Sequence, residues 1–488
     1  MPVTPFFSPW RPFLAALGSR TTQTLHQVRS HTLCQLEKCF AQWVPSDLFP
    51  KAEDKQNSRD RTYTRWRTFW CMLWQALNPE TPGREVVRQL QALFGLENGP
   101  MISEDDGAYC RAKARLPLDQ FSKALSAIGK TADRLVPALT QLQGRPLKAV
   151  DGSAVTVADT PKNRKAYPPL QCDKDVPAFP MVRIVVFFSV LSGAILTLAQ
   201  GSLGVSELSL FASLLSQLVS GDILLGDRGF GNYPVMALLK HNLGVDFIGR
   251  SIRGIDGRKR VKRLARNDWL ILWNKSPRPS PWLSALQWLG LPPQMTVRAL
   301  KGSCYQKGFR VRQVTLVTTL LDPKLYPAQE ILQAYLRRWR LEMCLDDLKT
   351  TLNLDMLPSR SPEMVQKELY MRLIAHNLIR CIAAQTATEH SVTLERISFK
   401  GTLDALRQFS QAMAQARSKK KRRQLWDQLL KTLAADLVPD RPGRREPRAI
   451  KRKKNKYPRL NVPRHKFRDH PKRNLRRKNA RLRRLGLM

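Results

Sequence analysis

The spacing of apolar residues changes character near residue 145. Before this point apolar positions recur at helical spacing, as in residues 24–44 and 84–96, and this pattern predicts amphipathic helices. From Leu147 onward, β-branched runs alternate with helical stretches, which is typical of a mixed α/β core. The sequence therefore predicts a helical N-terminal domain over residues 1–145 and an α/β domain over residues 146–390.

Strand-like and helix-like segments follow a definite order at the start of this second domain. The order is strand, strand, strand, helix, strand, helix, with strands at 148–160, 182–193, 194–202 and 222–230 and amphipathic helices at 207–221 and 234–243. The continuous apolar run from Ile184 to Ala199 has a second interpretation, a membrane span. However, it is shorter than the roughly 20 residues that a spanning helix needs. Ser192-Gly193 in its middle favours two buried strands joined by a tight turn.

The rest of the chain is predicted to contain an insertion, two long helices and a tail. Residues 245–325 are strand-like and basic, which indicates a β-rich insertion. One long helix is expected to begin near Pro327, and another at Ser361-Pro362, where a good N-cap residue precedes an N1 proline. Residues 391–440 form a C-terminal helical segment. Residues 441–488 are rich in proline and arginine and are expected to be disordered until they meet an anion.

The charge balance points to a polyanionic partner. The chain carries a formal net charge of +43, and residues 441–488 contribute 21 Lys or Arg against Glu446 and Asp469. Nucleic acid is the commonest partner of so basic a protein, and a membrane surface is the alternative. The eight cysteines are scattered without a C-x-x-C pattern, and no positive stretch precedes an N-terminal apolar segment. We therefore expect a cytoplasmic, nucleoid-associated protein.

Two aspartates occupy positions at which metal ligands are often found. Asp151 lies within an apolar strand, where a charged side chain is costly unless something pairs with it. Asp227 ends a short buried strand, and the carboxyl ends of parallel strands commonly carry ligand sites. Converging carboxylates are what magnesium-dependent phosphodiester chemistry requires. Taken alone, an aspartate at such a position is more often a cap or turn residue.

The helix after Pro327 places four functional residue types on one narrow stripe. At about 100° per residue, they lie within an arc of roughly 60°. The four are Tyr335, Arg338, Glu342 and Lys349. An exposed face with an ordinary ion pair between Arg338 and Glu342 explains the same spacing. The arc alone leaves both interpretations open.

The four residues match the pattern Y-x2-R-x3-E-x6-K without a gap, and this pattern resembles the signature of insertion-sequence transposases of the IS-4 type. Further stretches are similar to the same family: DGS at Asp151, GDRGF around Asp227, and residues 361–380 after the signature helix. The segments 78–90 and 105–117 resemble its leading domain. The resemblance covers about residues 65 to 390.

This resemblance implies a DDE transposase with a mixed α/β fold. The expected core is an RNase H-like mixed sheet flanked by helices, with the β-rich insertion between Asp227 and Glu342. Asp151, Asp227 and Glu342 would be the catalytic residues and the ligands of two Mg²⁺ ions, for which Mn²⁺ can substitute. The implied partners are double-stranded DNA, as transposon terminal inverted repeats and as target DNA, and a second copy of the chain in a synaptic homodimer.

The resemblance also assigns DNA contacts to the rest of the stripe. Arg338 and Lys349 would hold phosphates near the cleaved bond, and Tyr335 would contact the terminal phosphate or stack nearby. Some members of the family form a hairpin at the transposon end and stack a flipped base on a tryptophan of the insertion. Four tryptophans stand in this region, and packing in its core explains them equally well: Trp269, Trp273, Trp282 and Trp288.

The insertion contains a dense run of cations that we expect to contact the DNA backbone. The run comprises Arg258, Lys259, Arg260, Lys262, Arg263 and Arg266. Such charges fix the register of a protein on DNA without reading bases. Keeping a loop soluble is the alternative role for them.

Three other classes of protein share part of this evidence. An RNase H-like nuclease that cuts without joining would have the same three carboxylates. A silenced transposase that acts as a DNA-binding protein should have lost at least one of them, and none is lost. A ribonucleoprotein component would account for the basic tail but not for the stripe on the helix.

Overall fold

The computed structural model describes most of the 488 residues. The description covers residues 36–37, 39–48, 62–96, 101–137, 141–169, 179–251, 260–304, 312–416 and 418–439, with 479–480, 483–484 and 486 near the carboxyl end. The basic tail predicted for residues 441–488 thus lies almost wholly outside the described residues. None of the helices within this description is long and apolar enough to cross a membrane.

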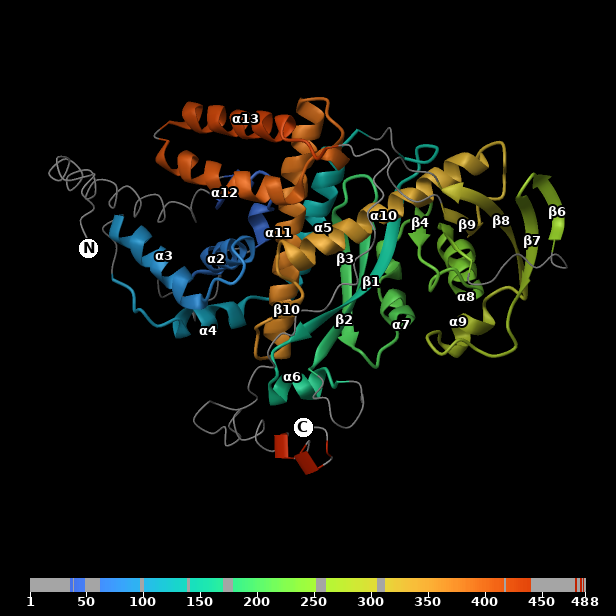
Figure 1. The fold of residues 1–488 in the computed structure, drawn as a ribbon, viewed down its shortest axis with the longest axis horizontal. Coiled ribbons are helices and arrows are strands. Elements are labelled where there is room, and N and C mark those ends of the chain that lie inside the picture. The colour runs from blue at the N-terminus through green and yellow to red at the C-terminus, as the bar shows by residue number, and fades with distance from the viewer. Residues whose placement is uncertain are drawn as a thin grey trace.

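The described part that precedes the first strand is helical. It contains a short 3-10 turn, Ser46–Leu48, and four α-helices: α2 (Arg65–Leu77), α3 (Gly83–Leu96), α4 (Gly107–Arg115) and α5 (Leu118–Arg134). Helix α2 begins where the Thr64 side chain accepts a hydrogen bond from the backbone N–H of Arg67, an N-cap. Figure 1 shows α2, α3 and α4 on one side of the long helix α11 (Pro362–Glu389), and the strands on the other.

Five strands form the centre of the α/β part. They are β1 (Leu147–Val157), β2 (Met181–Ser189), β3 (Ile195–Ser202), β4 (Ile223–Gly226) and β5 (Asp246–Arg250). Their spatial order is β3-β2-β1-β4-β5, in which β1, β4 and β5 are parallel and β2 and β3 antiparallel. The apolar run from Ile184 is thus a β-hairpin. This is the RNase H-like order, so the fold predicted from the sequence is confirmed.

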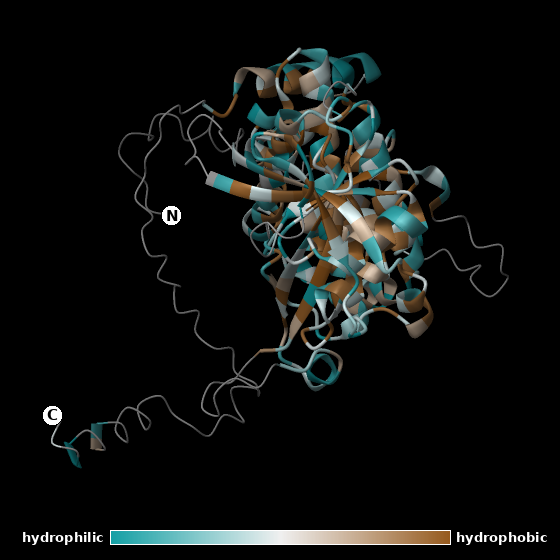
Figure 2. Ribbon diagram, turned by 90° about the vertical axis from the view of Figure 1, so that its right-hand side faces the viewer, coloured by the Kyte–Doolittle hydropathy of each residue, from teal (hydrophilic) through white to brown (hydrophobic). Residues whose placement is uncertain are grey.

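The insertion extends this same sheet instead of forming a separate one. Its elements are β6 (Arg260–Ala265), β7 (Asp268–Asn274), α9 (Ala285–Leu289), β8 (Gln294–Cys304) and β9 (Arg312–Thr318). Strand β9 pairs antiparallel with β5, and β8, β7 and β6 follow outward. A two-residue strand, β10 (Met356–Leu357), pairs with β1, which completes a ten-stranded sheet. Figure 2 shows brown, hydrophobic strands in the middle of the molecule.

Helices cover the two faces of the sheet. One face packs against α5, α10 (Ala328–Thr350) and α11, and the other against α7 (Glu207–Ala212) and α8 (Tyr233–Ala237). Successive residues of β1 take opposite sides, so that Ala149 belongs to the first core and Val150 to the second. Asp151 shares the pleat of Ala149 and therefore lies on the face that α10 covers.

The two long helices begin where the sequence predicts. Pro327 precedes α10, and Ser361 caps α11 by accepting a hydrogen bond from the backbone N–H of Met364. The helix expected over residues 207–221 is shorter than predicted, because α7 ends at Ala212 and a 3-10 turn follows at Leu215–Gln217. The Ser213 hydroxyl donates to the Leu210 carbonyl at this break, a local bond that competes with helix propagation.

Several shorter elements complete the described chain. Helix α6 (Pro161–Ala166) follows β1, and a π-helical turn, Leu238–Asn242, prolongs α8. After α11 come a 3-10 turn, Leu394–Arg396, and the antiparallel helices α12 (Phe399–Gln415) and α13 (Lys419–Ala435). Figure 1 shows α12 and α13 stacked beyond the end of α11.

Candidate active site

The pairing of β1 with β4 brings Asp151 and Asp227 to the same edge of the sheet. In the parallel register Leu147 lies opposite Ile223, and Ala149 opposite Leu225. Asp227 directly follows β4, so the same register continued by two residues places it beside Asp151. Both side chains are half-buried. Asp151 Oδ1 accepts a hydrogen bond of 2.8 Å from the Gly152 N–H, and Asp227 Oδ1 one of 2.8 Å from the Gly229 N–H.

Glu342 reaches this edge from α10, which packs across β1, β4 and β5. Arg338, one turn earlier, donates from Nη2 to Glu342 Oε1 at 2.8 Å. The Arg338 side chain is only 8% exposed, whereas that of Glu342 is 54% exposed. The ion pair expected from their spacing is therefore present, and it is formed by a cation held at the inner side of the helix.

Asp151 experiences the charges of all these groups. The pKa of its carboxyl is raised to about 6, mainly by burial and to a smaller extent by the negative charges of Asp227 and Glu342. The Gly152 N–H bond and the positive charge of Arg338 oppose this rise of the pKa. The three carboxylates and the Arg338 guanidinium thus occupy one electrostatic neighbourhood.

Tyr335 and Lys349 take different positions along α10. Tyr335 is buried, and the Arg338 guanidinium lies 5.5 Å from the centre of its ring. Burial raises the pKa of the Tyr335 hydroxyl, while Arg338 and Arg250 lower it. Lys349 is half-buried near the end of the helix, two turns beyond Glu342.

Arg250 is a candidate that the sequence motifs did not reveal. It ends β5, and Gly249, the residue before it, pairs with Gly226 of β4. The register therefore sets Arg250 beside Asp227, and its charge acts on Tyr335. A local signal was available, because the short strand DFIGR ends in a cation directly after the strand that carries Asp227. That cation becomes a candidate site residue only when the parallel pairing of β4 with β5 is known, and this pairing is a long-range feature.

The side chains as they stand do not form a closed metal cage. Across the described ranges, no three His, Cys, Asp or Glu side chains are close enough together to hold a metal ion. Glu342 is turned to Arg338 and is more than half exposed, so its side chain has room to rotate inward. The metal site predicted from the sequence stays a prediction.

The basic run of the insertion lies partly on β6, the outermost strand of the sheet. Arg258 and Lys259 fall outside the described residues. Arg260, Lys262 and Arg263 belong to β6 and are exposed, and Arg266 is exposed in the turn that follows. The Arg260 guanidinium lies 4.7 Å from the centre of the Trp269 ring on β7.

The tryptophans of the insertion pack largely in its core. Trp288 is buried, and Trp269, Trp273 and Trp282 pack partly buried against the same apolar cluster. This arrangement agrees with a structural role for all four.

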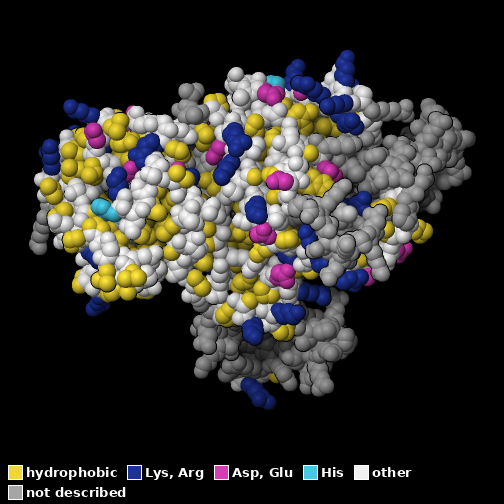
Figure 3. Space-filling model, turned by 180° about the vertical axis from the view of Figure 1, so that it is seen from behind, with side chains coloured by type: hydrophobic (Ala, Val, Ile, Leu, Met, Phe, Trp, Pro, Cys, Tyr) yellow, Lys and Arg dark blue, Asp and Glu magenta, His cyan; other side chains and the backbone are white. Residues whose placement is uncertain are grey.

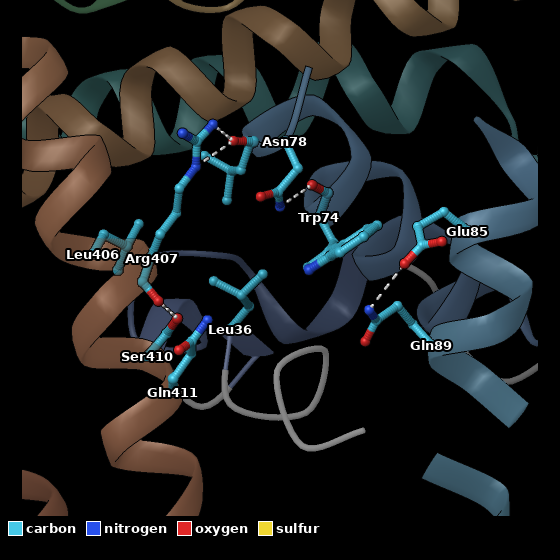
Figure 4. Close-up of a pocket in the computed structure, with 10 residues that line it drawn as sticks. Leu36, Trp74, Asn78, Glu85, Gln89, Leu406, Arg407, Ser410 and Gln411 are labelled. Atoms are coloured by element: carbon cyan, nitrogen blue, oxygen red, sulfur yellow. Dashed lines mark hydrogen bonds between the residues drawn. The ribbon is translucent and has the colours of Figure 1, made fainter. Parts of the chain in front are cut away.

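A cavity of about 240 Å³ lies away from the carboxylates. Figure 4 shows it between α2, α3 and α12, with the Trp74 ring and Leu36 on its walls. Arg407 of α12 donates from Nε to the Leu77 carbonyl at 3.0 Å, at the end of α2. The residues lining this cavity include none of the predicted catalytic residues.

Comparison with known proteins assigns the class of this chain. Residues 142–378 match the family described as the transposase DDE domain, and this range contains the β1–β4 edge and the whole of α10. This part of the chain is a transposase DDE domain. The IS-4 type inferred from the signature is confirmed by a relative, the transposase InsG for insertion sequence element IS4 of Escherichia coli (strain K12). The two are 26% identical over 315 residues, which cover 64% of this chain and 68% of InsG.

A solved structure also overlaps with most of the chain. It is the cryo-EM structure of a piggyBac transposase synaptic complex with hairpin DNA. The match has a TM-score of 0.35 and 11% sequence identity, and it covers 86% of this chain and 87% of the other. A likeness this low adds nothing to the fold or site described above.

Proposed function

We propose that this transposase cuts DNA at the ends of its own insertion sequence and joins those ends to target DNA, with Asp151, Asp227 and Glu342 as ligands of two Mg²⁺ ions. Transposases with this domain generally depend on divalent metal ions. When bound, such ions activate the attacking oxygen and stabilise the leaving oxygen. The choice of Mg²⁺, with Mn²⁺ as a substitute, rests on the hard, oxygen-only donor set.

One observation carries this proposal: the raised pKa of Asp151. Burial and two neighbouring carboxylates raise that pKa to about 6, and Arg338 is the cation that counters them. Negative charge crowded at one edge of a sheet disfavours full ionisation unless further cations are bound. Divalent ions would supply that positive charge, so the residues present fit the group that the proposal needs.

The remaining residues of the stripe would position the DNA. Arg338, a rigid planar cation under Glu342, suits a bidentate grip on a phosphate next to the cleaved bond. Lys349 would serve as a point charge for a phosphate further along the strand. Tyr335 and Arg250 border the same edge and would fix the terminal nucleotide.

The macromolecular partners follow from the same reaction. Double-stranded DNA, as terminal inverted repeats and as target, is the substrate we propose, and the net charge of +43 supports a polyanionic partner. Two ends must be held together for insertion, so we propose a homodimer in the synaptic complex. Work on chromosomal DNA would place the protein on the nucleoid in the cytoplasm.

The direct test uses the full chain and DNA carrying its own gene with both flanks. Incubation with Mg²⁺ or Mn²⁺ should yield nicked ends and, with added target plasmid, joined products, which gel electrophoresis separates from hairpins. A metal chelator should stop both. Nicks without any joined product would instead identify a nuclease, and uncut DNA under all these conditions would contradict the proposal.

Substitutions test the assignment of the three carboxylates. Asp227→Asn and Glu342→Gln should each lower the cleavage rate by about 10³-fold, since each removes a ligand of the metal ions that would stabilise charge in the transition state. Binding of end DNA, measured by gel shift, should persist. Asp346→Asn is the matched control, because Asp346 is an exposed acid one turn beyond Glu342. Cleavage retained by Asp227→Asn would overturn the site.

A further inference from the structure

Helix α13 begins with five consecutive cations, which run against the electrostatics of a helix. Lys419 to Arg423 occupy the first turn and the start of the second, directly after the Ser418 N-cap. The amino end of a helix carries a partial positive charge, so cations there are unfavourable and anions favourable. The stability of α13 therefore does not account for this sequence.

The cations of this run are not neutralised by the described part of the chain. Four of the five are exposed and Arg422 is half-buried, and none makes an ion pair with a residue that the structure describes. On the neighbouring helix α12 the situation is different, because Lys400 and Arg407 both pair with Asp404. The positive charge at the start of α13 is thus left for a partner outside the chain.

Polar and basic side chains continue along the solvent-exposed face of α13 toward its carboxyl end. Gln424, Gln428 and Lys431 follow Lys420 at spacings of four, four and three residues, so all four share one stripe, and all are exposed. Neither glutamine amide makes a side-chain hydrogen bond with the described part of the chain. Asp427 is the single acidic residue of the helix. Ammonium, guanidinium and amide groups are all donors that phosphate oxygens accept.

The opposite face of α13 is fixed firmly to the molecule. Leu429, Leu430 and Leu433 are buried in the main apolar core, and the Trp426 ring lies 5.9 Å from that of Trp43. Figure 3 shows Lys and Arg side chains standing out along the upper edge of the molecule, where α13 lies. The charges are therefore carried by a rigid helix on the outside of the protein, not by a loose loop.

We propose that the α13 basic face, defined as Lys419–Arg423 with Lys431, binds the sugar–phosphate backbone of double-stranded DNA outside the catalytic site. Duplex DNA carries one negative charge per about 1.7 Å, and an α-helix rises about 1.5 Å per residue. At about 100° per residue, Lys420, Arg423 and Lys431 project to one side of α13, so a duplex that lies along this side meets several cations at once. The binding would be independent of base sequence. The inference rests on the proposed function only in that DNA is the substrate.

The test compares two variants of the full chain that lose the same charge. In the first, Lys420→Gln, Lys421→Gln and Arg423→Gln are combined; in the control, Lys123→Gln, Lys130→Gln and Lys324→Gln remove three other exposed cations. Affinity for a fluorescent duplex is measured by anisotropy over a range of salt concentrations. Each lost phosphate contact lowers the salt slope by about 0.9, so the first variant should lose up to nearly 3 and the control little.

Further readouts separate DNA binding from other roles. The melting temperature of the first variant should stay the same or rise, because repulsion by the helix dipole is relieved. Cleavage with Mg²⁺ at saturating DNA should be unchanged. An unchanged salt slope in the first variant, or an equal loss of slope in the control, would overturn the inference. It would also be overturned if the first variant kept the wild-type salt slope on DNA but no longer bound phosphatidylglycerol vesicles. If the triple variant misfolds, single substitutions should each lower the slope by about 0.9.

The salt slope does not depend on catalysis. A wild-type chain that binds DNA through α13 but never cuts it would refute the proposed function and leave this inference standing. If the wild-type chain cuts DNA but the first variant keeps the same salt slope, the proposed function stands and this inference is refuted.

Discussion

Buried ionisable side chains set the behaviour of this protein at the scale of single residues. Arg338 is nearly inaccessible and yet faces a surface carboxylate, Glu342, while its charge also lowers the pKa of Asp151. A second buried group, His376 on α11, is unrelated to the carboxylates. Its ring stacks on Phe399 with centroids 5.1 Å apart. Arg338 thus acts on the candidate site, whereas His376 takes part in the packing of the fold.

His376 should make the fold sensitive to acid. Burial, and to a lesser extent Arg380, lower its pKa to about 3 from an ordinary value of 6.5. The folded form therefore holds the neutral ring, and stability is complete above pH 6.5. As the pH falls below this value, His376 binds a proton in the unfolded chain but stays neutral in the folded chain. The free energy of unfolding should then drop by at most about 1.4 kcal/mol per pH unit from this group.

Urea unfolding at pH 7.5 and pH 5.0 measures this effect. His376→Gln should show a smaller loss of stability between the two pH values than the wild type. His390→Gln, at an exposed position one residue beyond the same helix, should behave as the wild type does. Equal losses in all three proteins would show that His376 is not the acid-sensitive group.

At the scale of elements, close contacts between helices and strands hold the central sheet in place. Helix α5 crosses β3 at Gly129, where an added Cβ would lie 2.8 Å from the Ile195 carbonyl oxygen. The Asn377 side chain of α11 binds the same segment, accepting from the Ile195 N–H at 2.8 Å and donating to its carbonyl at 2.7 Å. Three elements therefore meet where only a glycine fits.

Gly129→Ala should destabilise the protein although alanine is the better helix former. The backbone carbonyl cannot yield without moving β3, so we expect a cost of about 1–3 kcal/mol, as for other overpacked sites. Gly95→Ala on α3 is the control, because nothing lies within 4 Å of the added Cβ. It should be neutral or stabilise by up to about 1 kcal/mol. Thermal melting distinguishes the two, and a stabilising Gly129→Ala would refute the contact.

Elements with strong local signals were predictable from the sequence, and those made by distant pairing were not. Pro327 and Ser361-Pro362 marked the starts of α10 and α11, and the β-branched runs marked β1 to β4. No local pattern shows that β9 pairs with β5, so the sequence indicated a β-rich insertion but not that its strands extend the central sheet. Arg250 was missed for the same reason. The helix predicted over 207–221 ends early, at Ala212, where the Ser213 hydroxyl bonds to the local backbone.

At the scale of the whole molecule, positive charge and crowded carboxylates are set apart from each other. Asp151 and Asp227 lie where β4 ends beside the middle of β1, and Glu342 lies on α10, which crosses there. In the described part of the chain, exposed cations that form no ion pair lie on β6, at one end of the sheet, and on α13; Figure 1 shows where these two elements lie. Such a division suits a duplex held by its backbone on outer surfaces while one phosphodiester reaches the acidic edge. The account therefore depends on three distant carboxylates that share metal ions.

Iron-directed cleavage of the polypeptide tests most directly whether the three carboxylates bind the same metal ions. Fe²⁺ bound in place of Mg²⁺, with ascorbate and peroxide, cuts the backbone near the ion, and mass spectrometry locates the cuts. The account predicts cuts close to residues 151, 227 and 342 together, all suppressed by excess Mg²⁺ and all lost in Asp227→Asn. Cuts at only one of the three segments, or a pattern indifferent to Asp227→Asn, would contradict it.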